Sequence, residues 1–191
     1  MQEVCYGEIQ HGHIEQVGYD TYCKLLDEVI KQMQGIEEVE EKDIQIDLAV
    51  SCYIPEEYIE NSAQKIEVYQ DIALCKTEED IQNVIDEIID RYGQMPSEVE
   101  NLIEIARIKN LGRRANILKI TQKKDGVVFL YDNSKFNMDI VMNLVKKYNR
   151  KVKFSPGIEP YVTLILEGKN DKEKLKEIEE FLMSNLADKK L

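Results

Sequence analysis

The stretch TEEDIQNVIDEIIDRYGQMPSEVENLIEIARIKNLG, residues 77–112, decides the fold because it predicts two amphipathic helices joined by a short turn. Thr77, followed three residues later by Asp80, is typical of a capping box at a helix N-terminus. Apolar side chains then recur at helical spacing: Ile81, Val84, Ile85, Ile88, Ile89 and Tyr92. A helix with one apolar stripe needs a partner surface to pack against.

The turn between the two helices is marked by glycine and proline. Gly93 stands where a left-handed C-cap ends the first helix. Pro96 and Ser97 restart the chain as a helix, and Glu100, three residues after Ser97, predicts a second capping box. The stretch is therefore expected to form a helical hairpin.

The face of the first helix opposite the apolar stripe is acidic. Its carboxylates are Asp80, Asp86, Glu87 and Asp90. Glu87 and Asp90 are three residues apart, so their side chains point the same way and repel each other. One interpretation is a solvated surface, because charged helix faces usually meet water. The other is a docking face for a cationic partner, and the pattern alone leaves both open.

Three segments carry a family resemblance. Residues 77–109 follow the pattern T-E-x-E-L-x-x-L-x-x-E-L-I-D-R-[FY]-G-x-L-P-x-x-V-x-N-L-L-x-[IL]-A-R-[IL]-K. DLAVSCYIPEEYI, residues 47–59, follows D-L-x-x-x-x-Y-I-P-x-x-Y-I, and GEIQHGHIEQVGYDTYC, residues 7–23, follows G-x-x-Q-x-G-H-I-x-x-V-G-[FY]-D-x-Y-C. The chain resembles the C-terminal part of the bacterial transcription-repair coupling factors over residues 7 to about 120, and beyond Ile120 the resemblance is weak.

The resemblance implies a non-catalytic regulatory domain. The whole proteins of this family are ATP-driven DNA translocases that dislodge RNA polymerase stalled at a lesion and recruit UvrA for nucleotide excision repair. Their terminal domain packs on an N-terminal UvrB-like module in the resting protein and masks its UvrA-binding face. Acids of the E-L-I-D-R motif meet arginines of that module, and here those acids are Glu87 and Asp90. The implied partners are this module directly, and UvrA, RNA polymerase and DNA through the whole protein.

Residues 1–43 are expected to form a separate part of the chain. Residues 7–18 resemble the end of the family's translocation motif, with Gln10 on that motif's glutamine. Residues 19–33 predict an amphipathic linker helix that ends at Gly35. The acidic residues 37–43 predict an extended linker. The motif's upstream arginine and both motor lobes are absent from the sequence. The resemblance therefore implies that ATP and Mg²⁺ bind in the missing motor domains and that this chain holds no cofactor.

Residues 44–191 are predicted to form a C-terminal regulatory domain of the α+β class. A strand at residues 44–48 precedes three helices. The first helix is capped by Asn61 or Ser62, and its inner face carries Ala63, Ile66, either Tyr69 or Gln70, and Ala73. The third helix is expected to end near Ala115. A hairpin (117–121 and 127–131), a helix after Asn137, strands at 152–154 and 161–166 and a helix at 170–186 follow. This second half predicts a small sheet with two helices on one face.

Charge is distributed unevenly along the chain. Residues 1–104 hold 26 Asp and Glu against 6 Lys and Arg, whereas residues 105–191 hold 11 against 19. The acidic half favours a basic protein partner. The alternative function is a nucleic-acid-binding module in the basic half, where Tyr131 and Tyr148 accompany a group of cations: Lys119, Lys123, Lys124, Lys146, Lys147, Arg150, Lys151 and Lys153.

Several function classes find no support in the sequence. There is no phosphate-binding loop, dinucleotide fingerprint or nucleophile elbow, so no catalytic residue is expected. Cys5, Cys23, Cys52 and Cys75 are widely spaced, and His11 and His13 lack partner ligands, so neither a metal site nor a disulfide framework is expected. The sequence holds no run of 18 apolar residues and no signal segment, which predicts a cytoplasmic protein without a membrane partner.

Overall fold

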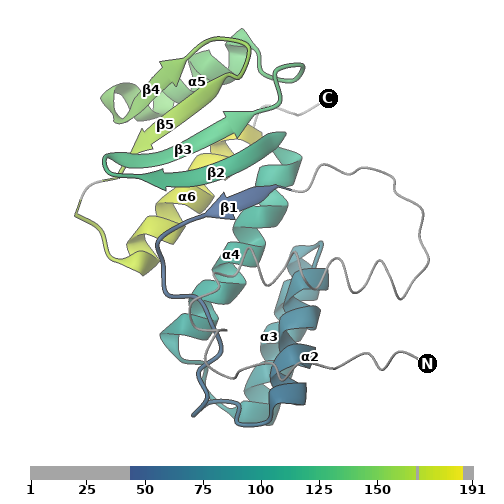
Figure 1. Cartoon of the computed structure of the whole chain (residues 1–191). Helices are drawn as coiled ribbons and strands as arrows, with labels where there is room; N and C mark the ends of the chain where they lie inside the picture. The colour runs from purple at the N-terminus through teal and green to yellow at the C-terminus, as the bar shows by residue number, and fades with distance from the viewer. Residues whose placement is uncertain (1–43, 167, 187–191) are drawn as a thin grey trace, which may run out of the picture. The chain divides into compact units, whose positions relative to one another are not determined.

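The helices and strands of the domain are shown in Figure 1, a computed structural model that describes residues 44–166 and 168–186. In chain order they are β1 (Gln45–Asp47), α2 (Ser62–Leu74), α3 (Glu78–Tyr92), α4 (Ser97–Arg114), β2 (Ile117–Lys123), β3 (Gly126–Tyr131), α5 (Met138–Tyr148), η1 (Asn149–Lys151), β4 (Val152–Ser155), β5 (Tyr161–Ile165) and α6 (Asp171–Leu186). The predicted α+β class is confirmed. The linker helix at 19–33 lies outside the described residues, so the domain boundary after residue 43 stays a prediction.

The five strands form one mixed sheet in the order β1-β2-β3-β5-β4. The β2–β3, β3–β5 and β5–β4 pairs are antiparallel, and β2–β3 is the predicted hairpin. β1 pairs with β2 in parallel, with Ile46 opposite Ile120. The sequence predicted β1 as a strand but not its place in the sheet, because its partner follows three helices later.

Helices cover one face of this sheet. α4 and α6 pack along each other, and α5 lies beside α6 under β4 and β5 (Figure 1). Their core includes Phe181, whose ring centroid lies 4.4 Å from that of Phe129 and 5.4 Å from that of Tyr148. The expected pair of helices, α5 and α6, is present, and α4 extends the layer toward β1.

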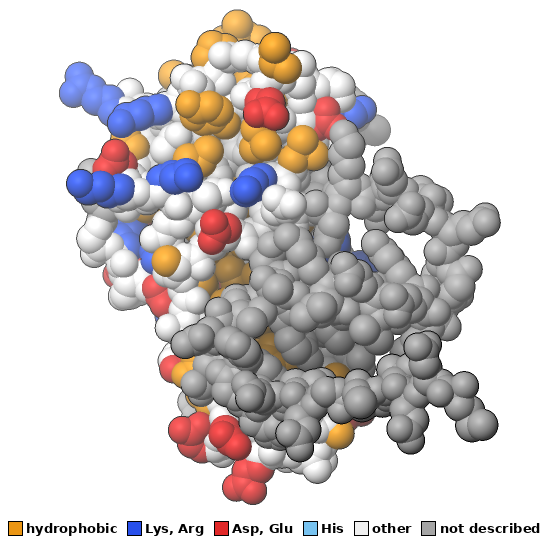
Figure 2. Space-filling model, viewed as in Figure 1, with side chains coloured by type: hydrophobic (Ala, Val, Ile, Leu, Met, Phe, Trp, Pro, Cys, Tyr) orange, Lys and Arg blue, Asp and Glu red, His pale blue; other side chains and the backbone are white. Residues whose placement is uncertain are grey.

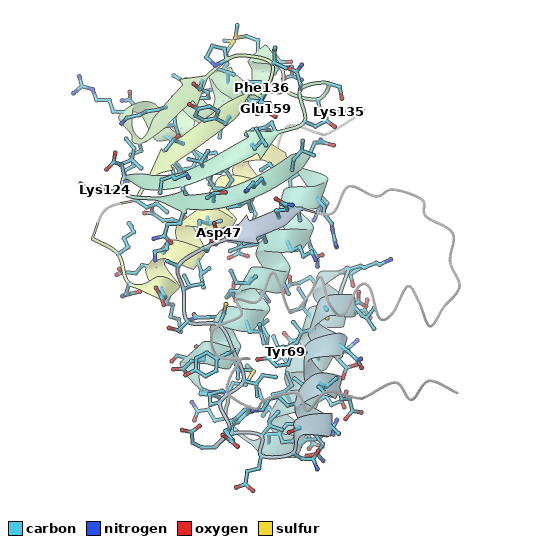
Figure 3. The ribbon with its side chains drawn as sticks, in the orientation of Figure 1. Asp47, Tyr69, Lys124, Lys135, Phe136 and Glu159 are labelled. Carbon is cyan, nitrogen blue, oxygen red and sulfur yellow. The ribbon has the colours of Figure 1, made fainter. Side chains whose placement is uncertain are left out.

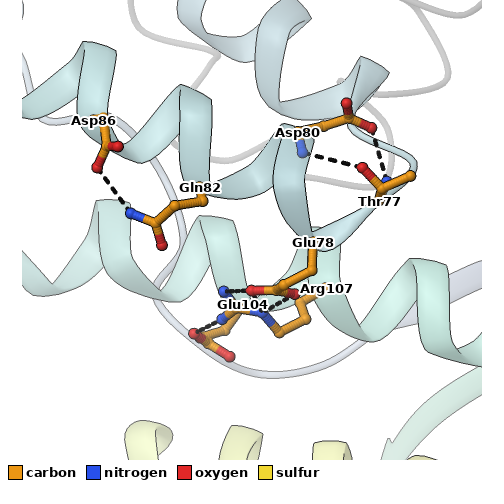
Figure 4. Close-up of polar contacts among 7 residues, drawn as sticks. All are labelled: Thr77, Glu78, Asp80, Gln82, Asp86, Glu104 and Arg107. Atoms are coloured by element: carbon orange, nitrogen blue, oxygen red, sulfur yellow. Dashed lines mark hydrogen bonds and ion pairs between the residues drawn. The ribbon is translucent and has the colours of Figure 1, made fainter.

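The helix pair α3–α4 has one of its two predicted capping boxes. The Thr77 hydroxyl accepts the Asp80 amide at 3.1 Å, and the Asp80 carboxylate accepts the Thr77 amide at 2.8 Å (Figure 4). The second box, at Ser97, is wrong. Pro96 takes the N-cap position of α4, which moves Ser97 into the first turn, where its hydroxyl donates to Glu98 at 3.1 Å.

The predicted inner face of α2 is right at Tyr69 but wrong at Ala63 and Ile66, which are exposed. Asn61 caps the helix as expected, with its side chain accepting the Ala63 amide at 2.9 Å. The buried side chains are Val68, Tyr69 and Ile72, whereas Ile66 is 45% exposed. Tyr69 fixes this rotation, because its hydroxyl accepts the amide of Ile54 at 2.8 Å inside the core.

Arg107 joins α3 to α4 by an ion pair with Glu78, whose own side chain is 66% exposed. Its guanidinium donates to both carboxylate oxygens of Glu78, at 2.6 and 2.9 Å, and also to Glu104 (Figure 4). The side chain of Arg107 is only 18% exposed. The hydrogen bonds that Arg107 donates to Glu78 raise the pKa of Arg107 above its ordinary value, so the cation is permanent.

The β2–β3 hairpin generates a stability prediction at Gly126. A Cβ atom there would lie 2.0 Å from the carbonyl oxygen of Leu164 in β5, and the backbone of a paired strand cannot move aside. Gly126→Ala is expected to destabilise the domain by about 2 kcal/mol or more, measured by urea unfolding.

Gly157 provides the matched control, because a Cβ atom there would meet nothing within 4 Å. Gly157→Ala should leave the free energy of unfolding within about 0.5 kcal/mol. Equal effects of the two substitutions would show that the strand spacing around Gly126 is not a constraint.

Candidate interaction surface

Within residues 44–166 and 168–186, no group of three or more His, Cys, Asp or Glu side chains is arranged to hold a metal ion. Burial raises the pKa of the Cys75 thiol to about 11, which keeps it protonated at neutral pH. No helix in the described part of the chain is both long and apolar enough to span a membrane.

Acidic side chains from two neighbouring helices meet on one surface. Glu67 and Asp71 come from α2, and Glu87 comes from α3; we call these three residues, together with the exposed Asp90 three positions after Glu87 on α3, the α2–α3 acidic surface. Glu67, Glu87 and Asp90 are exposed, and Asp71 is half-buried between the helices. Of the predicted site residues, Glu87 and Asp90 thus lie on a solvent-facing surface, while Gln10 lies outside the described residues.

Arg91 is held within this surface by two carboxylates. Its Nη1 donates to Glu87 at 2.8 Å, one turn away on α3, and its Nη2 donates to Glu67 of α2 at 3.1 Å. The guanidinium also lies 5.1 Å from the centroid of the Tyr92 ring. One cation therefore stands among three carboxylates, Glu67, Asp71 and Glu87, which leaves an excess of negative charge.

Asp71 is the residue that this excess affects most. Burial raises the pKa of Asp71, the neighbouring charges of Glu87 and Glu67 raise it further, and Arg91 partly opposes them. The sequence analysis did not identify Asp71 or Glu67. Their spacing of four residues places them on one face of α2. Only the packing of α2 on α3 reveals that this face meets Glu87.

Comparison with known families places this surface in a recognised domain. The sequence profile of the TRCF domain matches residues 48–140, which include α2, α3 and α4. The chain carries a TRCF domain. The predicted family resemblance is thereby confirmed.

Curated relatives agree with this assignment. The chain is 38% identical to the transcription-repair-coupling factor of Staphylococcus haemolyticus over 119 residues, which are 61% of this chain and 10% of that protein. It is 38% identical to the Bacillus subtilis factor over 122 residues, 63% of this chain and 10% of the relative. The Rickettsia typhi factor is 33% identical over 153 residues, 79% of this chain and 14% of the relative. The chain spans about a tenth of the length of these relatives.

A solved structure shows the same fold. The crystal structure of the C-terminal domain of a transcription-repair coupling factor superposes with a TM-score of 0.70 and 22% sequence identity. The match covers 75% of this chain and 92% of that domain. It extends the structural likeness beyond the 48–140 region, to the part of the chain where the sequence patterns were weak.

The basic half of the TRCF domain lacks the exposed aromatic rings that nucleic-acid binding was expected to use. Tyr131 is 2% exposed, and its hydroxyl donates to Asn185 at 2.8 Å. Tyr148 packs on Phe181 and shares a hydrogen bond with Ser184. Tyr131 belongs to the core and cannot stack on a base, and Tyr148 is half-buried, with the ammonium of Lys147 5.5 Å from its ring centroid.

The cations of this half are also dispersed. Lys124 lies in the turn of the β2–β3 hairpin (Figure 3), whereas Lys146 and Lys147 lie on α5 and Arg150 lies on η1. A strip of phosphate contacts requires cations along one groove. The arrangement therefore gives less support to the nucleic-acid hypothesis than the sequence did.

The raised pKa of Asp71 generates a pH-dependent prediction. Because this pKa is higher in the folded than in the unfolded chain, the ionised carboxylate weakens folding. The effect is absent below the ordinary aspartate pKa of about 3.9 and develops as the pH rises through the folded-state pKa. Asp71→Asn should therefore raise the urea midpoint at pH 7, and the gain should disappear near pH 4.

Asp90→Asn is the control, since it removes the same charge from an exposed position on α3. It should change the free energy of unfolding by no more than about 0.5 kcal/mol at either pH. A gain from Asp71→Asn that is identical at both pH values would contradict the electrostatic origin.

Proposed function

We propose that this TRCF domain is a non-catalytic regulatory domain whose α2–α3 acidic surface docks on an arginine-bearing module of the same longer protein. That module is the N-terminal UvrB-like part of the coupling factor, and docking masks its UvrA-binding face in the resting state. The observation that carries the proposal is the group of three carboxylates on two packed helices around one arginine, with the exposed Asp90 further along α3.

The position of Arg91 shows what this surface can hold. Two carboxylates from different helices, Glu67 and Glu87, accept one guanidinium in a fork at 2.8 and 3.1 Å. Arginine pairs with carboxylates through such geometry more specifically than lysine does. Asp90 and Asp71 retain carboxylate oxygens for further arginines, and an incoming cation would relieve the repulsion that raises the pKa of Asp71.

Rigid support favours docking without rearrangement. α3 is capped at Thr77 and held to α4 through Glu78 and Arg107, and its buried Ile81 and Ile88 are 3% and 2% exposed. Charged groups on preformed elements bind with less loss of conformational freedom than groups on loops. Glu87 and Asp90 are therefore presented in one fixed arrangement.

The longer protein is, in this proposal, the ATP-hydrolysing DNA translocase that removes stalled RNA polymerase and recruits UvrA. ATP and Mg²⁺ bind in its motor domains. The TRCF domain contacts UvrA, RNA polymerase and DNA only indirectly, by controlling access to the masked face.

The proposal predicts that Glu87→Arg with Asp90→Arg abolishes docking. Placing a cation against the arginines of the module should weaken binding by about 2–5 kcal/mol, roughly 30-fold or more. The measurement is titration of the 191-residue chain with the separately expressed N-terminal module, and UvrA capture by the full-length variant. The variant should bind UvrA without a stalled polymerase.

The control for net charge is Asp125→Arg with Glu159→Arg, two exposed acids in the sheet half. This variant should dock as the unmodified chain does. Because Glu87 pairs with Arg91 at the surface, the site variant should lose no more than about 1 kcal/mol of folding stability. If the folded site variant still docks normally and full-length UvrA capture stays low, the assigned surface is wrong.

A second prediction concerns catalysis. The sequence holds no loop that could cradle a nucleotide phosphate, so the purified chain should hydrolyse ATP no faster than a heat-denatured sample. Phosphate release is the measurement. Turnover that survives a further purification step would overturn the non-catalytic assignment.

A further inference from the structure

Helix α5 exposes an apolar stripe to solvent at the end of the domain farthest from α2 and α3 (Figures 1 and 2). Met138, Met142 and Val145 occupy positions i, i+4 and i+7, so they share one side of the helix. Their exposed fractions are 70%, 63% and 47%. A row of exposed apolar side chains at helical spacing differs from scattered surface residues and marks an interaction site.

This stripe is additional to the apolar face that α5 uses in the fold. Leu144 is 1% exposed, and Tyr148 packs on Phe181 of α6. The helix therefore already has a complete attachment to the core. Folding of the domain does not require apolar side chains at Met138 and Met142.

A neighbouring turn extends the apolar surface. Ile158, between β4 and β5, is 90% exposed. Tyr131 connects this turn to the start of α5, because its amide donates to the carbonyl of Pro160 at 3.0 Å and its ring lies 4.9 Å from that of Phe136. Figure 3 places Phe136 and Glu159 together at this end, next to Met138 and Ile158 in sequence.

Basic residues flank the stripe. Residues 135–153 hold six Lys and Arg and one acid, Asp139. Lys146 follows Val145 on the exposed side of α5, and Arg150 and Lys151 continue beyond the helix C-terminus. Neither Lys146 nor Arg150 has an ion-pair partner among the described residues. The surface therefore combines an apolar centre with cations whose charge is not balanced locally.

We propose that this α5 surface is a second docking site, which takes an acidic amphipathic helix of a partner protein. The i, i+4 row formed by Met138 and Met142 matches the ridge that inserts between side chains of a packed helix. Methionine adapts its shape to an apolar partner, as in other helix-binding surfaces. Glutamate or aspartate beside the partner's apolar face would meet Lys146 and Arg150.

The chemistry of the surface favours a protein helix over other occupants. Nucleic acid would use the cations, but it offers no apolar face for Met138, Met142 and Ile158. A lipid surface would accept the cations and the apolar groups. However, the stripe is narrow and contains no aromatic anchor, and the opposite face of α5 is attached to the core. The site lies at the other end of the domain from the α2–α3 acidic surface, so it is independent of the function proposed above.

The experiment uses the ¹⁵N-labelled 191-residue chain and a synthetic 18-residue helical peptide. The peptide carries leucines at i, i+4, i+7 and i+11 and glutamates on both flanks. One control peptide has the same composition in scrambled order, and the other has lysine in place of each glutamate. We expect saturable binding of the first peptide and an affinity lower by roughly tenfold or more for both controls. The amide chemical shift changes should be confined to α5 and the β4–β5 turn.

Variants test the two components separately. Met138→Gln with Met142→Gln should weaken peptide binding by about tenfold or more, and Lys146→Glu with Arg150→Glu should do so most strongly at low salt. Met183→Gln is the matched control, because Met183 is 45% exposed on α6 and lies outside the stripe. It should bind as the unmodified chain does.

Parallel titrations with a 30-base-pair duplex, anionic lipid vesicles and the unlabelled chain itself define the alternatives. Peptide binding that is unaffected by the methionine substitutions, or that maps elsewhere, overturns the proposal. Tighter binding to duplex or vesicles, lost with Lys146→Glu and Arg150→Glu, assigns the surface to that ligand instead. Concentration-dependent self-association through the same amides assigns it to a second copy.

Discussion

The burial of α4 is the constraint on which the rest of this domain depends. Val99, Leu102 and Ile108 are completely buried, and neighbouring positions on other sides of the helix are nearly so. It packs against α2 and α3 in the helical half of the domain, and against α6 and β2 in the sheet half. A helix that is apolar over most of its circumference must be enclosed, and here two different layers enclose it. Gly112 completes the arrangement, because a Cβ atom there would lie 2.3 Å from Ile44 beside β1.

This architecture separates two kinds of surface. The helical half presents carboxylates around Arg91, and the sheet half presents cations and apolar side chains around α5. Both sets lie on helices whose other faces are anchored in the core. The charge asymmetry visible in the sequence is thus not cancelled by folding. The fold instead distributes it to opposite ends of the domain (Figure 2).

The sequence predicted those features that local interactions decide. The Thr77 capping box, the turn at Gly93, the end of α4 near Ala115 and the β2–β3 hairpin depend on residues close to one another in the chain. The second capping box was predicted wrongly because the N-cap residue of α4 is Pro96 and not Ser97. The face of α2 was predicted only in part, because Ala63 and Ile66 fit the same helical period as Tyr69, whereas the packing of the helix buries Val68 and Ile72 beside Tyr69. The proximity of Asp71 to Glu87 arises between helices, so no spacing within one segment reveals it.

The parallel pairing of β1 has a mechanical consequence. The chain enters the domain at Ile44 and continues directly into β1, which is held at the sheet edge by the pairs Gln45–Lys119, Ile46–Ile120 and Asp47–Thr121. A force transmitted along the preceding chain therefore acts first on these three pairs, before it reaches any helix. Detaching this one strand would expose Ile120 and free the space beside Gly112, while α2 and α3 keep their caps and their contacts. β1 is thus the element of the domain on which a pulling force from the preceding residues would act first.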